Sequence, residues 1–144
     1  MPEQLRTVLI IDDDPQFLLT LGAYLEDSGY MVIQANDGQE GVELFALHHP
    51  DIVVTDLRMP RMDGVGVLQN IKEQSPQTPL IVFTGTSGHY GTKQLEQQGA
   101  WCCLYKPLDD PRHLVFAIEM ALAGKTADSF LRHCNLMESA ENKG

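Results

Sequence analysis

Carboxylates stand at the ends of two short apolar runs in this sequence. Asp12 and Asp13 follow the run TVLII at residues 7–11, and Asp56 closes the run DIVVTD at residues 51–56. If both runs are parallel strands of one sheet, their carboxyl ends lie at the same edge and the acidic side chains converge there. Carboxylates so close together repel one another, and the usual relief is a hard cation with oxygen ligands, of which Mg²⁺ fits best.

A hydroxyl group and an ammonium group complete this candidate site. Thr84 ends the apolar run PLIVFT, and Lys106 follows the run AWCCLY. Lys106 is a point charge suited to a phosphoryl oxygen, and Thr84 offers a hydroxyl at the same edge. Together with Asp56 these side chains suit transfer of a phosphoryl group onto a carboxylate, because that reaction depends mainly on positioning and charge neutralisation.

The elements that must position these residues alternate along the chain. Strands are expected at residues 7–11, 30–35, 51–56, 79–85 and 100–105. Helical patterns follow at about 15–27, 37–49, 64–74 and 87–98, and from Asp109 or Asp110 to about 124. In the second helix Val42, Phe45 and Ala46 are expected to face the core. This alternation predicts parallel βαβ units, and hence an α/β fold with an open, doubly wound, five-stranded parallel sheet covered on both faces.

Length and composition limit the organisation and the partners. The 144 residues suit one domain, expected at 1–124, with 125–144 as a frayed helical extension or a linker toward a missing output region. The net charge of -10 argues against direct binding of nucleic acid or an anionic membrane. Neither a membrane-spanning run nor a signal-peptide layout is visible, so a cytoplasmic location is expected. The three cysteines lack metal-ligand spacing and have apolar neighbours, which predicts buried thiols.

Four motifs in order resemble the receiver domains of two-component response regulators. They are the acidic group of VLIIDDDP, the segment DLRMPRMDG, the hydroxyl that ends LIVFT and the Lys-Pro of LYKPL. The resemblance covers residues 7 to about 124. It implies a flavodoxin-like (βα)5 fold with strand order 2-1-3-4-5, and a phosphoprotein that assists its own phosphorylation and dephosphorylation rather than a classical enzyme.

The resemblance also implies roles for single residues. Asp56 would be the phosphoacceptor, Thr84 would contact the phosphoryl group and Lys106 would pair with it. The implied Mg²⁺ ligands are Asp12, partly through water, Asp13, Asp56 and the backbone carbonyl of Arg58. The bond between Lys106 and Pro107 is expected to be cis.

Partners follow from the same resemblance. A sensor histidine kinase or a phosphotransfer protein would phosphorylate Asp56. The face from strand four to helix five would then change its affinity for a downstream output domain or adaptor, and a homodimer is a further arrangement seen in relatives. Trp101, beside strand five, is expected either to pack or to serve as an exposed interaction residue on that face, and Tyr105 is similar.

The sequence departs from the family pattern near the candidate site. Receivers commonly place Phe or Tyr three residues before the lysine, whereas this chain has Cys103 there. A switch that couples Thr84 to an aromatic ring is therefore in doubt, and the loop after strand four becomes the alternative. Gly85 would make that loop more flexible, and Arg58 and Thr86 would flank the path of attack. A narrower likeness points to receivers of the regulator that delivers the stationary-phase sigma factor to proteolysis, and of relatives with a phosphatase-like output domain.

Three other functions fit parts of the sequence. A haloacid-dehalogenase-type phosphatase would use Asp12 and Asp14 as an Asp-x-Asp pair, but it leaves DLRMPRMDG unexplained. A flavin-binding domain of the same topology needs a Ser, Thr and Gly loop after strand one, where this chain has three aspartates. A receiver-fold module that binds its partner without phosphorylation remains open, and the effect of Asp56→Ala on regulation would distinguish it.

Overall fold

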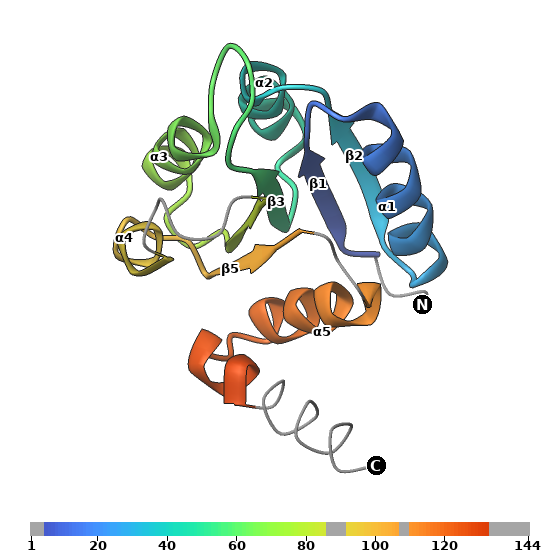
Figure 1. Cartoon of the computed structure of the whole chain (residues 1–144), viewed down its shortest axis with the longest axis vertical. Coiled ribbons are helices and arrows are strands. Elements are labelled where there is room, and N and C mark those ends of the chain that lie inside the picture. Colours follow the sequence, from blue (N-terminus) through green and yellow to red (C-terminus); the bar gives the residue numbers. More distant parts are fainter. Residues whose placement is uncertain (1–4, 86–91, 107–109, 133–144) are drawn as a thin grey trace.

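A single parallel sheet with helices on both faces forms the framework of the computed structural model, which describes residues 5–85, 92–106 and 110–132. The strands are β1 (Thr7–Ile11), β2 (Met31–Ala35), β3 (Ile52–Asp56), β4 (Leu80–Thr84) and β5 (Cys102–Tyr105). The helices are α1 (Pro15–Asp27), α2 (Gly38–His48), α3 (Gly64–Gln74), α4 (Thr92–Gln97) and α5 (Pro111–Leu122). The strands lie in the order β2-β1-β3-β4-β5 and all pair in parallel (Figure 1). The predicted fold class and strand order are therefore confirmed.

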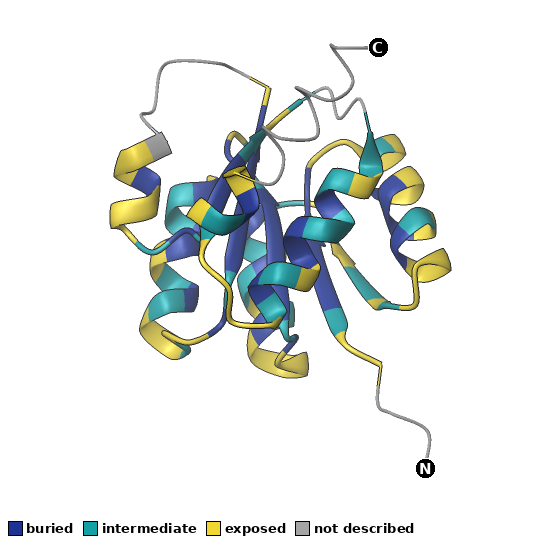
Figure 2. Cartoon of the chain, turned by 90° about the horizontal axis from the view of Figure 1, so that it is seen from below, coloured by how far each residue is buried: buried dark blue, intermediate teal, exposed yellow. Residues whose placement is uncertain are grey.

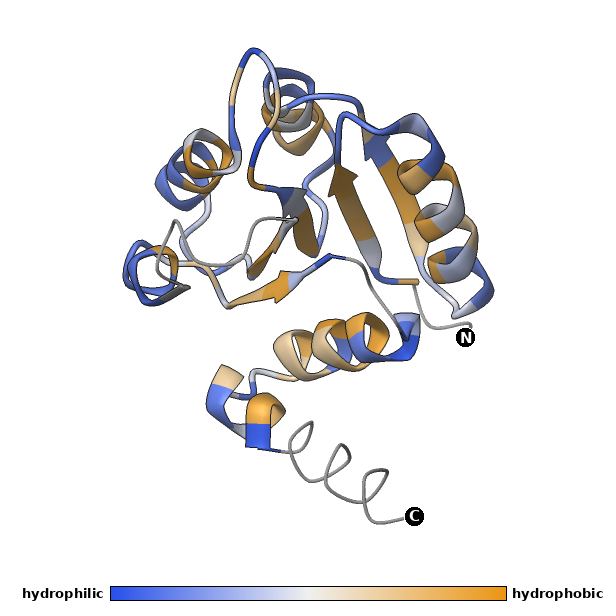
Figure 3. Cartoon of the chain, in the orientation of Figure 1, coloured by the Kyte–Doolittle hydropathy of each residue, from blue (hydrophilic) through white to orange (hydrophobic). Residues whose placement is uncertain are grey.

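Two layers of helices bury the two faces of the sheet. α1 and α5 cover one face, and α2, α3 and α4 cover the other (Figure 1). Successive side chains of β1 serve opposite faces, because Val8 and Ile10 belong to the core cluster beside α1 and α5 while Leu9 and Ile11 belong to the other cluster. The central strands β1, β3 and β4 are accordingly buried on both sides, whereas the edge strand β2 is partly exposed (Figure 2). The apolar stripes of α1 and α5 face the sheet (Figure 3).

Aspartates begin four of the helices. Asp14, Asp37, Asp63 and Asp110 are the N-caps of α1, α2, α3 and α5, and each side chain accepts a hydrogen bond from a backbone N–H in the first turn. Such a cap contributes about 1 kcal/mol to helix stability, because it satisfies an otherwise unpaired donor. Of the two cap candidates for the last helix, Asp110 is the one the structure describes in this role; Asp109 lies outside the described residues.

α2 contacts its neighbours through glycines rather than through a conventional apolar stripe. A Cβ atom on Gly41 would meet the side chain of Ile11 at 2.3 Å, and one on Gly38 would meet the carbonyl oxygen of Met62 at 2.2 Å. The buried positions of α2 are these two glycines and Phe45. Ala46, expected to face the core, is exposed instead, because the close approach through the glycines turns that side of the helix to solvent.

The helix expected at 87–98 appears as the shorter α4, with residues 87–91 outside the described part of the chain. Leu95 anchors it, with 1% of its surface exposed, in the cluster that also holds Ala100. Within the described residues, no helix combines the length and the apolar character that a membrane crossing requires.

The segment after α5 folds back onto the domain. A further helical stretch covers residues 127–132 (Figure 1). Its Phe130 is only 1% exposed. The ring of Phe130 lies against Trp101 and Phe116, at centroid distances of 5.7 and 5.8 Å. Trp101 donates its indole N–H to the carbonyl of Lys125 at 3.0 Å. Trp101 therefore packs against the C-terminal segment, and residues 125–132 add to the core beside α5.

Candidate functional site

Four strands end at the edge of the sheet where the candidate residues lie. Ile11 of β1 pairs with Thr55 of β3, so Asp12 and Asp56 follow side by side. Asp56 pairs with Phe83, which places Thr84 one residue further along β4. Thr84 in turn pairs with Tyr105, so Lys106 comes directly after that pair. The buried β3 strand thus delivers Asp56 to the edge on a rigid support.

Three carboxylates converge at this edge. One carboxylate oxygen each of Asp12, Asp13 and Asp56 lies within 4.8 Å of the others. Asp12 is almost fully buried, Asp56 is partly buried and Asp13 is exposed. A donor set made only of carboxylate oxygens, open on one side, has the chemistry that a hard divalent cation prefers. The residues present therefore fit a metal of the Mg²⁺ type.

Lys106 bridges two of these carboxylates. Its Nζ atom lies 2.5 Å from Oδ2 of Asp12 and 3.5 Å from Oδ2 of Asp56. Burial works to lower the pKa of Lys106, but its hydrogen bonds and ion pairs with Asp12 and Asp56 outweigh burial and raise the pKa above its ordinary value. The ammonium group therefore stays charged and offsets part of the negative charge of the site.

The carboxyl group of Asp56 is electrostatically strained. Burial is the largest influence and raises its pKa, and the negative charge of Asp12 acts in the same direction. The charge of Lys106 and the backbone N–H groups of Leu57 and Arg58 lower the pKa without cancelling the rise. A carboxylate that is held ionised at such a position gains from any cation placed beside it.

This strain predicts a pH-dependent effect of Asp56→Asn on stability. The folded pKa of Asp56 lies above its ordinary value of 3.8, so between these values the folded state holds more protons than the unfolded state. Stability of the metal-free protein therefore falls as pH rises through that window. Asp56→Asn should be more stable than wild type at pH 7 without divalent cations, and the gain should disappear as pH drops to the ordinary value. Urea unfolding across this pH range, in chelator, measures the difference; a gain independent of pH would contradict the assignment.

The loop that follows Asp56 is held close to it. Oδ1 of Asp56 accepts the N–H of Leu57 at 2.7 Å, and the N–H of Gly64 donates to the carbonyl of Leu57 at 2.7 Å. A Cβ atom on Gly64 would come within 2.6 Å of the carbonyl oxygen of Asp56, so only glycine permits this approach. Arg61, which has a φ of 71°, forms an ion pair with Asp37 of 3.2 Å that links the loop to the start of α2.

The structure describes fewer contacts for the remaining residues that the sequence predicts at the site. Thr84 is 5% exposed at the end of β4, and its carbonyl accepts the N–H of Lys106 at 2.8 Å. Arg58 lies in the loop after β3, and the role of its carbonyl as a metal ligand stays a prediction. Pro107, with its expected cis bond, and Thr86 lie outside the described residues.

Cys103, which stands where receivers commonly have an aromatic residue, points into the core. It belongs to the cluster beneath α2, α3 and α4 and is 9% exposed. Burial, with a smaller effect from the charge of Glu96, raises the pKa of its thiol to about 11. The predicted buried thiols are therefore confirmed for Cys102 and Cys103. The side chain of Cys103 packs in the core and offers no aromatic ring that could change rotamer.

Sequence patterns missed an aromatic contact at the site. The ring centroid of Phe17 in α1 lies 4.3 Å from Nζ of Lys106. The helical spacing of Phe17 contains no signal that its ring meets a lysine 89 positions later. The dehalogenase interpretation gains no support, because Asp14 is occupied as the N-cap of α1, where it accepts the N–H of Gln16 at 3.0 Å.

Comparisons with known proteins agree on one family. The sequence model of the response regulator receiver domain matches residues 8–119. The transcriptional regulatory protein PdtaR of Mycobacterium tuberculosis is 36% identical over 119 residues, which are 82% of this chain and 57% of PdtaR. The curated relatives include much longer proteins, since the match spans only 10% of the sensor kinase/phosphatase LuxN of Vibrio campbellii.

Solved structures point the same way. A response regulator receiver domain protein from Clostridium thermocellum is 30% identical, with a TM-score of 0.78 over 83% of this chain and 95% of that one. A chain of the CheX-CheY-BeF3-Mg²⁺ complex from Borrelia burgdorferi is also 30% identical, with a TM-score of 0.75 over 81% of this chain and 88% of that one.

Proposed function

Because this chain belongs to the response regulator receiver domain family, we propose that it is a switch controlled by phosphorylation of Asp56. The observation behind this proposal is the meeting of Asp12, Asp13, Asp56 and Lys106 at one edge of the sheet. A strained carboxylate beside a fixed ammonium group is suited to become an acyl phosphate.

The donor would be a phosphohistidine of a sensor kinase or of a phosphotransfer protein. An Oδ atom of Asp56 attacks phosphorus, the bond from phosphorus to the histidine nitrogen breaks, and the leaving imidazole ends as neutral histidine once protonated. Lys106, already directed at Asp56, pairs with a phosphoryl oxygen as charge moves onto that group. The hydroxyl of Thr84 would contact a second oxygen from the end of β4. The chain thereby assists its own phosphorylation and dephosphorylation, and these are its only proposed chemical steps.

Receivers of this family use Mg²⁺ at an acidic pocket, and we propose Asp12, Asp13, Asp56 and the carbonyl of Arg58 as its holders here. The ion, when bound, neutralises the carboxylates and the incoming phosphoryl oxygens. Asp12 also anchors Lys106, whereas Asp13 is exposed and has no such second partner among the described residues.

Because Asp13 does not also hold Lys106, Asp13→Asn tests the metal site more cleanly than a substitution of Asp12 would. We expect it to raise the Mg²⁺ dissociation constant by about tenfold or more while leaving the fold intact, because it removes one anionic ligand at an exposed position. Isothermal titration with MgCl₂ measures the constant, and Asp27→Asn, at the far end of α1, is the matched control for the loss of charge. Equal affinities for Asp13→Asn and wild type would remove Asp13 from the ligand set.

Partners and domain organisation are part of the same proposal. We place the receiver at residues 1–124, and residues 125–144 would lead toward an output region, with residues 125–132 packed on the domain. The phosphorylated face from β4 to α5 would bind an output domain, an adaptor or a second copy of the chain. The likeness to both regulators and a sensor kinase supports kinase and output partners without identifying them.

Labelling tests the proposed function directly. Incubation with acetyl phosphate and Mg²⁺ should add one phosphoryl group at Asp56, located by borohydride reduction of the acyl phosphate and peptide mass mapping. Modification at Asp12 instead, or none with or without Mg²⁺, would refute the proposal. Beryllofluoride with Mg²⁺ provides a second readout through the fluorescence of Trp101, which lies at the opposite end of β5 from Lys106 and therefore reports changes transmitted away from the site.

A further inference from the structure

We propose that Phe17 is a positioning residue for phosphoryl transfer, because its ring holds the ammonium group of Lys106 between Asp12 and Asp56. The inference rests on the proposed function and adds to it a residue outside the acidic cluster. Two contacts and one feature of the surface carry it: the ring against the ammonium group, a second ring that braces the first, and a groove beside the ring that the ammonium group would otherwise enter.

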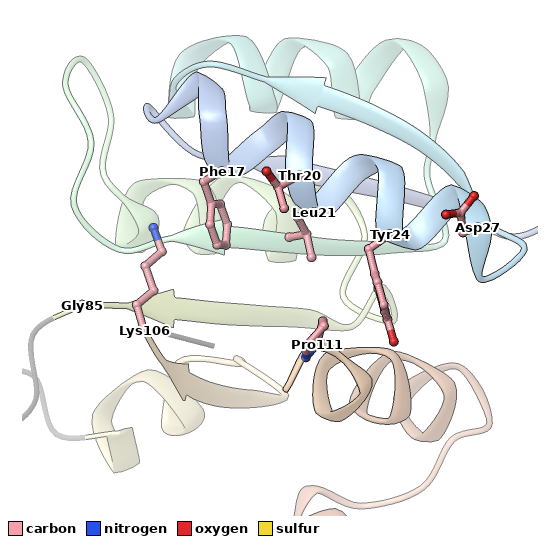
Figure 4. A pocket seen from close by; sticks show the side chains of 8 residues that line it. All are labelled: Phe17, Thr20, Leu21, Tyr24, Asp27, Gly85, Lys106 and Pro111. Carbon is pink, nitrogen blue, oxygen red and sulfur yellow. The ribbon is translucent and has the colours of Figure 1, made fainter. Parts of the chain in front are cut away.

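The first contact places the ammonium group on an aromatic ring. Lys106 extends from the end of β5, and its Nζ atom meets Asp12 at 2.5 Å, Asp56 at 3.5 Å and the ring centroid of Phe17 at 4.3 Å. Figure 4 shows the side chain of Lys106 reaching from β5 toward the ring on α1. The electron-rich ring attracts a cation at this distance, and more so where water is partly removed, as at a lysine whose side chain is 23% exposed.

The second contact keeps the ring in place. Phe17 meets Phe83 edge to face, with centroids 5.8 Å apart and planes at 60°. Phe83 is 1% exposed and directly precedes Thr84 on β4, so the brace belongs to the rigid sheet. The N-cap Asp14 accepts the N–H of Phe17 at 3.4 Å, which fixes the backbone of the first turn of α1. The ring is therefore positioned before any ligand arrives.

The third observation is the space that the ammonium group would otherwise enter. A groove of about 770 Å³ runs between α1 and the start of α5, and Phe17, Leu21, Lys106 and Pro111 are among the residues that line it (Figure 4). The four-carbon chain of a lysine side chain is flexible. Without the ring, the ammonium group could therefore turn into this groove and be hydrated there. The contact with Asp56 is the longer of its two ion pairs and would be lost first.

Substitutions at Phe17 separate this role from simple packing. Phe17→Leu keeps an apolar side chain but removes the ring, whereas Phe17→Tyr keeps the ring. With acetyl phosphate and saturating Mg²⁺, Phe17→Leu should lower the phosphorylation rate constant roughly threefold to tenfold, the size expected of a partly desolvated cation–π contact. The Mg²⁺ dissociation constant should stay within about twofold, and Phe17→Tyr should retain the wild-type rate constant. Phe116→Leu, on the same face but at α5, is the control and should not slow phosphorylation.

A double-mutant cycle tests whether the effect passes through Lys106. The variant Lys106→Met should itself be phosphorylated slowly, and in that background Phe17→Leu should cause no additional loss. An equal fold loss in both backgrounds, a rate of Phe17→Tyr as low as that of Phe17→Leu, or an unchanged rate in Phe17→Leu would overturn the proposal.

One readout does not depend on phosphorylation. In metal-free protein the ε-methylene protons of Lys106 should show an upfield ring-current shift in NMR spectra, kept in Phe17→Tyr and lost in Phe17→Leu. Absence of that shift in wild type would refute the positioning role. Its presence in a protein that acetyl phosphate fails to label would refute the proposed function alone.

Discussion

Replacing Asp56 by asparagine should abolish acyl phosphate formation, lowering incorporation from acetyl phosphate by about 10³-fold or more. The amide preserves the size of the side chain and its hydrogen bond from Leu57, but it lacks the anionic oxygen that attacks phosphorus. Incorporation of radiolabelled phosphoryl groups, followed under identical Mg²⁺ concentrations, measures the loss.

Asp14→Asn is the matched control for this experiment. It also removes one negative charge, from the acidic run after β1 that contains Asp12 and Asp13, yet asparagine is as good an N-cap as aspartate, so α1 keeps its first turn. We expect its incorporation to stay within about twofold of wild type. Persistent labelling of Asp56→Asn, or an equal loss in Asp14→Asn, would show that another group accepts the phosphoryl group or that charge alone governs the reaction.

Replacing Phe130 by alanine should reduce the free energy of unfolding by about 3–5 kcal/mol. The side chain is 1% exposed and fills the space between Trp101 and Phe116, and alanine would leave a cavity there. Urea unfolding monitored by circular dichroism measures the change.

Leu131→Ala, at the adjacent position, provides the comparison, because Leu131 is 41% exposed and should change stability by less than about 0.5 kcal/mol. If Phe130→Ala costs no more than Leu131→Ala, the segment after α5 does not belong to the core in solution. A large loss confined to Phe130→Ala would show that residues 125–132 belong to the folded core together with Trp101.

The glycines of α2 and of the loop after β3 have structural roles that local sequence patterns do not reveal. Gly38 and Gly41 are weak helix formers, and nothing in their spacing indicates that they allow α2 to approach Met62 and Ile11. Helical periodicity predicts that Ala46 faces the core. Because the glycines bring α2 close to its neighbours, Ala46 is instead exposed to solvent. The close approach of Gly64 to the carbonyl of Asp56 is likewise decided by the tertiary structure.

The sequence by itself determined the α/β class, the parallel pairing of the strands and the group of residues at their ends, whereas the strand order came from the resemblance to receiver domains. The sequence could do so because apolar runs that end in polar residues, alternating with helices, leave few parallel arrangements, and all of them bring the carboxyl ends of the strands to one edge. Only the tertiary structure decided what surrounds Lys106 and where Phe130 goes. Phe17 and Lys106, like Trp101 and Phe130, come from separate elements, and contacts between distant elements depend on how helices pack on the sheet, which no local pattern of residues encodes.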